Sequence, residues 1–275
     1  MVEGVLGMAE SVQGGLVQAT QVAREATVRK SPNGIHFAAF GETGLDQAEL
    51  ARMVQAVPSS VAAALVRKSY YFVPLALAEG RTGDSTGHRG GNEATMVSPV
   101  YTTELAELAI CHRNVALPAG PEGGEGEGVF ISSRLLNDRF SLAFEFFINV
   151  GHAFVDVAGV PEGFTELAWN QVVADVRGET SQDAWENRSA AFAAGEDSKR
   201  RLDEKAKTEF LEAAFSDAIA IYLLSLSVDF DYSELREREY PLLAPQALAD
   251  RLRLVARLFP PNPDYEFAIR YRRRA

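Results

Sequence analysis

Two long, mostly apolar stretches stand out in the second half of the chain. The first covers residues 139–158 and follows Asn137 and Asp138, either of which can cap a helix. The second covers residues 205–226. Apolar residues on nearly every face are typical of helices in a protein core, so both stretches predict buried helices.

Shorter patterns predict a small sheet and further helices. Runs rich in aromatic and β-branched residues predict strands at 35–40, 69–77, 115–117 and 128–135. Helical spacing predicts helices at 45–68 with a bend at Pro58, at 102–113 and at 245–258. Together these elements predict an α+β fold that is mainly helical and has a small mixed sheet.

The sequence predicts a short N-terminal segment that is separate from the main domain. Residues 1–32 are rich in Val, Ala, Gln and Gly with a weak helical period, and a Ser-Pro-Asn-Gly sequence then breaks the pattern. We therefore predict an N-terminal helical appendage at 1–32 and a main domain at 33–275 that ends in a helix and a basic tail. Residues 80–92, with five glycines, are predicted to form a flexible loop.

The net charge and the cysteine content indicate which partners and which cellular compartment to expect. The 27 Lys and Arg residues are outnumbered by 38 Asp and Glu residues, so the net charge is -11 and nucleic acid is not an expected partner. The single cysteine, Cys111, cannot form an intrachain disulfide, which fits a reducing cytoplasm. No apolar run reaches the roughly 18 residues of a membrane span, so no membrane partner is expected.

A polar stripe interrupts the first apolar helix. Its residues are Ser141, Glu145, Asn149, His152 and Asp156, spaced by four, four, three and four. At about 100° per residue these positions share one face, and buried polar groups need partners, so the stripe is a candidate site. The same spacing also fits a stripe that faces water, or a histidine and aspartate that satisfy each other.

The second apolar helix also contains a candidate site residue, Asp217. It lies between apolar neighbours, so an inward-facing carboxylate there needs a partner, and we expect that partner to be His152. A surface position beside Glu212 and Ser216 is the alternative that the spacing permits.

The sequence Gly-His-Ala-Phe-Val-Asp at 151–156 resembles the second half of the zinc-binding helix of the lethal-factor-like zincin metallopeptidases. In that family a histidine, a glutamate, two further residues and a second histidine lie on one helix. Residues 205–226 resemble the later helix that carries a glutamate ligand, and the upstream elements follow in the same order. The resemblance covers about residues 35–226 and implies a zincin-like domain with an edge strand at 128–135 beside the peptide-binding cleft.

The zinc-binding motif is incomplete, so the resemblance implies a degenerate member of the zincin family. With His152 as the second histidine, Ile148 takes the place of the first ligand and Asn149 that of the general base. Isoleucine cannot ligate a metal and an amide cannot take a proton from water. If instead His152 is the first histidine, Ala153 takes the place of the base. We therefore expect no zinc or other cofactor; any metal that did bind would use His152, Asp156 and Asp217.

Three functions remain open at this level. The first is a pseudo-peptidase that binds a peptide or protein ligand in the inherited cleft without cutting it. The second is a non-peptidase enzyme or an atypical metal-dependent hydrolase that uses Glu145, His152, Asp156 and Asp217. The third is an acidic protein-interaction module in which the cleft has no function.

Overall fold

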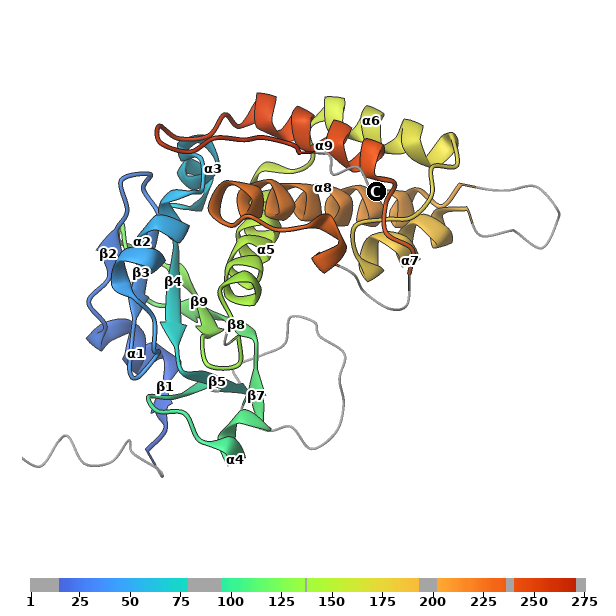
Figure 1. Cartoon of the computed structure of the whole chain (residues 1–275). Coiled ribbons are helices and arrows are strands. Elements are labelled where there is room, and N and C mark those ends of the chain that lie inside the picture. The colour runs from blue at the N-terminus through green and yellow to red at the C-terminus, as the bar shows by residue number, and fades with distance from the viewer. Residues whose placement is uncertain (1–14, 79–94, 137, 193–201, 236–239, 271–275) are drawn as a thin grey trace, which may run out of the picture. The chain divides into compact units, whose positions relative to one another are not determined.

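The computed structural model describes residues 15–78, 95–136, 138–192, 202–235 and 240–270 (Figure 1). Its content of 49% helix and 17% strand confirms the predicted α+β fold, in which helices predominate. The chain separates into two compact units. Unit 1 comprises the described parts of 1–55 and 66–145, and unit 2 comprises 56–65 and the described parts of 146–275.

Unit 1 is built on a mixed sheet of five strands in the order β2-β3-β4-β9-β8. The strands are β2 (Arg29–Lys30), β3 (His36–Ala39), β4 (Lys68–Val73), β9 (Gly126–Ser132) and β8 (His112–Leu117). The three central strands β3, β4 and β9 are parallel, and the two outer strands pair with them in the antiparallel direction. The predicted strand at 35–40 is therefore confirmed as β3.

A second sheet of unit 1 has the order β1-β6-β5-β7 and is antiparallel throughout. Its strands are β1 (Val17–Gln18), β6 (Thr95–Ser98), β5 (Leu75–Ala78) and β7 (Ala109–Ile110). The single strand predicted at 69–77 is thus two strands, β4 and β5, which belong to different sheets. The break falls at Pro74, whose ring leaves no backbone N–H for a ladder hydrogen bond.

The described part of the predicted N-terminal appendage packs into unit 1. β1 pairs with β6 and β2 pairs with β3. Between them lies helix α1 (Ala19–Glu25), whose Ala19 and Val22 are buried in one cluster with Tyr71 and Phe130. The rings of Tyr71 and Phe130 stack with their centroids 4.7 Å apart. Residues 15–30 therefore contribute to the sheets and core of unit 1, and residues 1–14 lie outside the described residues.

The helix predicted at 102–113 is wrong over most of its length. Helix α4 covers only Thr103–Ala106, where the hydroxyl of Thr102 accepts a hydrogen bond from the Leu105 N–H. The chain then forms β7 and β8, which pair with β5 and β9. Helical propensity is a weak determinant here, because pairing with the neighbouring strands supplies backbone hydrogen bonds and side-chain packing that favour strand structure.

The helix predicted at 45–68 is divided at Pro58, as expected for a proline inside a helical pattern. Helix α2 covers Gln47–Gln55, and after Pro58 the chain forms the short helix α3 (Ser59–Ala62) and a 3-10 turn at Ala63–Leu65. Lys68 already belongs to β4. The predicted C-terminal end of this helix was therefore too late.

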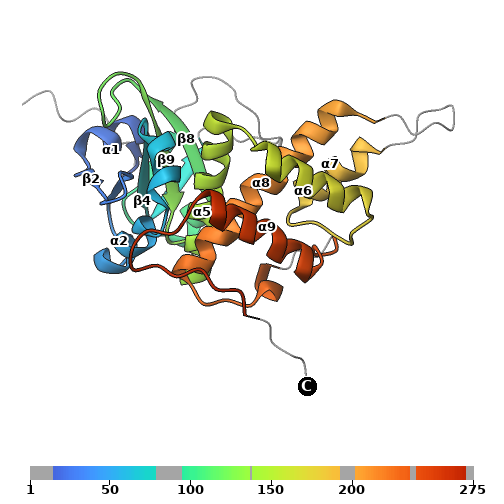
Figure 2. The same cartoon turned by 90° about the horizontal axis from the view of Figure 1, so that it is seen from above.

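Unit 2 is a group of helices around α8 (Glu204–Ser227), most of whose residues are buried. Helices α6 (Glu162–Val173) and α9 (Pro245–Leu258) lie side by side on one side of α8, and α7 (Gln182–Ala191) packs against it near one end (Figures 1 and 2). Helix α5 (Arg139–Ala158) begins in unit 1 and continues in unit 2. The three helices predicted at 139–158, 205–226 and 245–258 are confirmed.

Helices α5 and α8 are long and apolar enough to span a membrane by length and composition. The expectation that no stretch reaches this length was therefore wrong. In the structure 56% of the most apolar window of α5 and 72% of that of α8 are buried. Burial to this extent is typical of core helices, which pass the same test of length and composition.

Candidate functional site

The polar stripe of α5 is buried at its middle and exposed at its end. Asn149 is buried, Ser141 and Glu145 are half-buried, and His152 and Asp156 are exposed. The expectation of a wholly buried stripe is therefore wrong for the last two residues, where the alternative of a face toward water holds. The cause is that Phe146, Phe147 and the other apolar side chains of this helix fill the buried faces.

Asp217 is buried, but the partner found for it differs from the predicted one. Its Oδ2 accepts a hydrogen bond of 2.7 Å from the hydroxyl of Thr180, which precedes α7. Burial raises the pKa of the carboxyl to about 6, against the lowering effects of hydrogen bonds from Ser181 and Thr180 and of the charge of Arg251. The predicted partner, His152, lies exposed on α5.

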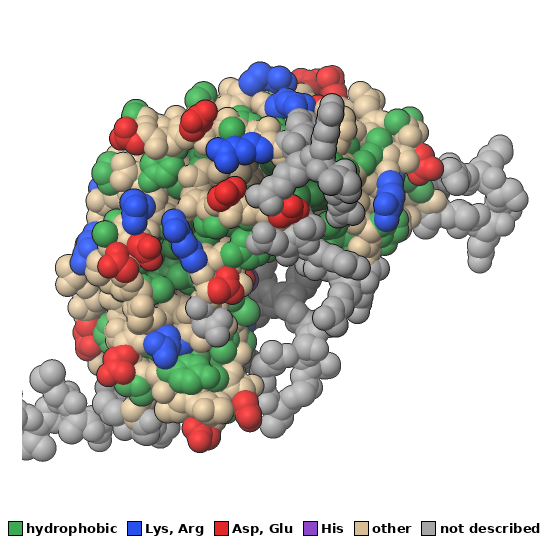
Figure 3. All heavy atoms as spheres, viewed as in Figure 1, with side chains coloured by type: hydrophobic (Ala, Val, Ile, Leu, Met, Phe, Trp, Pro, Cys, Tyr) green, Lys and Arg blue, Asp and Glu red, His purple; other side chains and the backbone are tan. Residues whose placement is uncertain are grey.

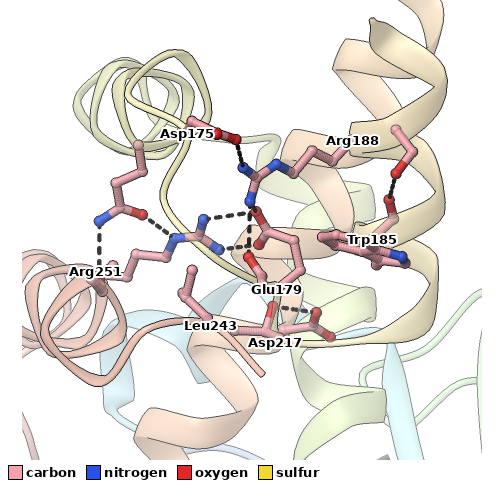
Figure 4. A network of polar contacts seen from close by, with 12 residues as sticks. Asp175, Glu179, Trp185, Arg188, Asp217, Leu243 and Arg251 are labelled. Atoms are coloured by element: carbon pink, nitrogen blue, oxygen red, sulfur yellow. Dashed lines mark hydrogen bonds and ion pairs between the residues drawn. The ribbon is translucent and has the colours of Figure 1, made fainter. Parts of the chain in front are cut away.

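A buried network of charges lies next to Asp217 in unit 2 (Figure 4). Glu179 and Arg251 are fully buried, with Arg251 Nη1 2.9 Å from Glu179 Oε2. Arg188 approaches the other carboxylate oxygen at 3.1 Å, and the Nε of Arg251 donates to Gln171 Oε1 at 2.7 Å. The network ties the segment before α7 to α6 and α9, and its burial fits a structural role better than ligand binding.

Sequence reasoning missed this network because its members lie far apart along the chain, on α6, before and within α7, and on α9. Glu179 and Arg251 lie 72 positions apart, and no spacing relates them. A polar residue inside the amphipathic pattern of 245–258 was the one available sign, since Arg251 occupies a position that the helix buries.

Strand β8 forms one edge of the five-stranded sheet in unit 1. The N–H of Ser132 donates to the C=O of Cys111 at 2.8 Å, which fixes the alternation of hydrogen bonds between β8 and β9. By this alternation Arg113, Val115 and Leu117 bond to β9, whereas His112, Asn114 and Ala116 turn their N–H and C=O groups away from it. The side chains of these last three residues are all exposed. Among the described strands, none pairs with this outer side of β8.

The open edge was expected at 128–135, and this was wrong. That segment is β9, which pairs with β4 on one side and β8 on the other. The opposite edge of the sheet differs from β8, because β2 is two residues long and both are basic. Short, charged strands are a common protection against edge pairing, and the six-residue β8 contains neither Lys nor Pro.

His112 and Glu145 form a close pair beside this edge. The Nδ1 of His112 lies 2.5 Å from the Oε1 of Glu145, and the side chains are 44% and 16% exposed. Both residues belong to unit 1, with Glu145 on the first part of α5. Of the predicted site residues, Glu145 is thus the one that lies beside the edge strand. Its partner was missed because His112 was assigned to a helix.

Cys111 precedes the edge strand and is exposed. Desolvation and then the charge of Glu145 raise the pKa of its thiol. A raised pKa disfavours the thiolate, which is the nucleophilic form of cysteine. Cys111 is therefore poorly suited to act as a nucleophile.

Within the described parts of the chain, no group of three or more His, Cys, Asp and Glu side chains is placed to hold a metal ion. The expected loop at 80–92, with His88, lies outside the described residues. On the face in Figure 3 the basic side chains are interspersed with acidic ones. The described residues on this face therefore form no extended basic surface.

Neither a protein-family model, nor a curated protein, nor a solved structure matches the chain.

Proposed function

We propose that the protein binds an extended peptide, or an extended segment of a protein, as an added strand on β8. The observation that carries this proposal is the row of outward backbone groups on His112, Asn114 and Ala116. An extended peptide satisfies such groups by continuing the sheet, and its alternate side chains then supply specificity.

We also propose that the bound peptide is not cleaved, so that the protein is a zincin-like pseudo-peptidase. Ile148 and Asn149 support this, since neither can replace the histidine ligand and the glutamate base that the family resemblance requires. For the same reason we propose that the protein acts without zinc or another cofactor. Its excess of acidic residues favours a peptide partner over nucleic acid, and its single cysteine favours the cytoplasm.

The test is to close the strand edge without disturbing the sheet. In Asn114→Pro the lost N–H is one that points away from β9, so the sheet keeps its internal hydrogen bonds. Binding of blocked, strand-forming heptapeptides from a mixed library is measured by affinity selection and mass spectrometry. We expect Asn114→Pro to weaken the binding of selected peptides at least tenfold while the melting temperature stays close to that of the parent.

Lys30→Pro is the matched control. By the same alternation, the N–H of Lys30 in β2 points away from β3 at the opposite edge of the sheet. This variant should bind peptides like the parent. Equal binding by the parent and Asn114→Pro would contradict the proposal, as would selection of no peptide by the parent.

A further inference from the structure

The His112–Glu145 pair occupies the place where an added strand presents a side chain. Successive side chains of a strand alternate between the two faces, so His112, Asn114 and Ala116 share one face. Contact between His112 and Glu145 shows that at its first residue this is the face next to α5. Val115 and Leu117 point to the other face, where they pack with the cluster around Phe130.

The register of an added strand follows from the backbone groups that are available. In an antiparallel pairing, a ligand residue opposite His112 exchanges two backbone hydrogen bonds with it and lies about 5.5 Å away between Cα atoms. The two side chains then stand next to each other on the same face. A long side chain at this ligand position extends past the imidazole toward the carboxylate of Glu145, which touches the imidazole at 2.5 Å.

The charge of the pair decides which ligand side chain is favoured. With the imidazole neutral and its Nδ1–H donated to Glu145, the pair carries one negative charge, and this is the state that a preference for a cationic ligand requires. The Glu145 side chain is 16% exposed, so its interactions are screened less than those of a surface group. An acidic ligand side chain at this position would be repelled, and a neutral one would gain nothing.

We infer that the strand edge selects peptides with a lysine or arginine opposite His112. The His112–Glu145 pair binds the cationic side chain at this position. This inference rests on the proposed function and adds to it the chemical class of the ligand. The next outward residue, Asn114, presents an uncharged amide, so the preference for a cationic side chain should be confined to one position of the ligand.

Cys111 allows the register to be fixed in the experiment. It is the one cysteine of the chain, and it is paired with Ser132 directly before β8. A blocked peptide Thr-Val-Thr-Val-X-Cys, added antiparallel, places its cysteine opposite Cys111 and residue X opposite His112. The mixed disulfide is brought to equilibrium at pH 8.5 in a thiol–disulfide buffer and quantified by intact mass for X as Lys, Gln and Glu.

We expect the lysine peptide to be captured about five- to tenfold more strongly than the glutamine peptide by the parent, with the glutamate peptide weakest. Glu145→Gln should remove most of the difference, because it keeps a hydrogen-bonding group and loses the charge. Glu107→Gln, which removes an exposed charge of the same unit next to α4, should leave the difference unchanged. Differences in thiol reactivity among the peptides cancel between parent and variant.

The outcomes separate this inference from the function on which it depends. A Thr-Pro-Thr-Pro-X-Cys peptide serves as reference, since proline prevents strand pairing. If the three strand-forming peptides exceed the reference but do not differ from one another, the charge preference is refuted and strand addition stands. If none exceeds the reference, strand addition itself is refuted.

Discussion

Gly151 of α5 lies directly against Ser216 of α8. A Cβ atom added to Gly151 would come within 2.6 Å of the Ser216 carbonyl oxygen and 3.1 Å of its hydroxyl oxygen. The absence of a side chain therefore lets the two helix backbones approach closely at this point. The glycine that precedes His152 thus has a packing role in unit 2, independent of any resemblance to a zinc-binding helix.

We predict that Gly151→Ala lowers the stability of unit 2. The methyl group must push α5 and α8 apart, and overpacking of this kind costs about 1–3 kcal/mol in the free energy of unfolding. Gly163→Ala is the control, because a Cβ at that helical position meets nothing within 4 Å and alanine favours a helix. Urea denaturation followed by circular dichroism compares the two. A Gly151→Ala variant as stable as Gly163→Ala would refute the close crossing.

Asp217 predicts a specific dependence of stability on pH. Burial raises the pKa of its carboxyl from 3.8 to about 6 in the folded protein. Between these values the folded protein holds a proton that the unfolded chain has lost. The contribution of Asp217 to the free energy of unfolding therefore falls by about 2–3 kcal/mol as the pH rises through this window.

Asp217→Asn isolates this effect, since the amide oxygen still accepts the hydrogen bond from Thr180. We expect the variant and the parent to have similar stability near pH 4, and the variant to be more stable at pH 7. The measurement is urea denaturation of both proteins from pH 4 to 7.5. Parallel stability curves for the two proteins over that range would contradict a buried, titrating Asp217.

The buried network around Glu179 predicts an unusually costly substitution. In Glu179→Gln the guanidinium groups of Arg188 and Arg251 lose the carboxylate between them, and breaking a buried charge pair costs about 3–5 kcal/mol. Asp250→Asn is the control, because Asp250 pairs with Arg253 on the surface and should change the free energy of unfolding by less than about 1 kcal/mol. Equal melting temperatures for the two variants would show that the network does not stabilise unit 2.

Much of the helical framework could be predicted from sequence because its patterns are long and locally capped. Helix α5 is an example: Asp138 accepts a hydrogen bond from the Ser141 N–H, and the apolar residues that follow need burial. The edge strand could not be predicted in the same way. Residues 109–117 take strand form only through pairing with β5 and β9, which lie elsewhere in the chain.

The candidate site was only partly predictable for the same reason. Glu145 was identified from its place in a polar stripe, but its partner His112 lies 33 positions earlier on another element. For Asp217 the need for a partner was correctly inferred from its apolar surroundings. The identity of that partner, Thr180, depends on how the segment before α7 packs against α8, which no local pattern encodes.

We predict that the purified protein retains no stoichiometric zinc after dialysis, because Ile148 and Asn149 leave the family motif without its first ligand and its base. Elemental analysis by mass spectrometry provides the measurement. One zinc ion per chain, lost in His152→Ala, would refute the inactive assignment and restore His152 as a ligand.

Amide hydrogen exchange along β8 tests the central claim most directly. In the protein without ligand, the N–H groups of Arg113 and Val115 should be protected by β9, and those of His112, Asn114 and Ala116 should exchange rapidly. When a selected strand-forming peptide saturates the protein, we predict that exchange at these three outward amides slows at least tenfold. Unchanged exchange at all three amides in the saturated complex would contradict strand addition on β8.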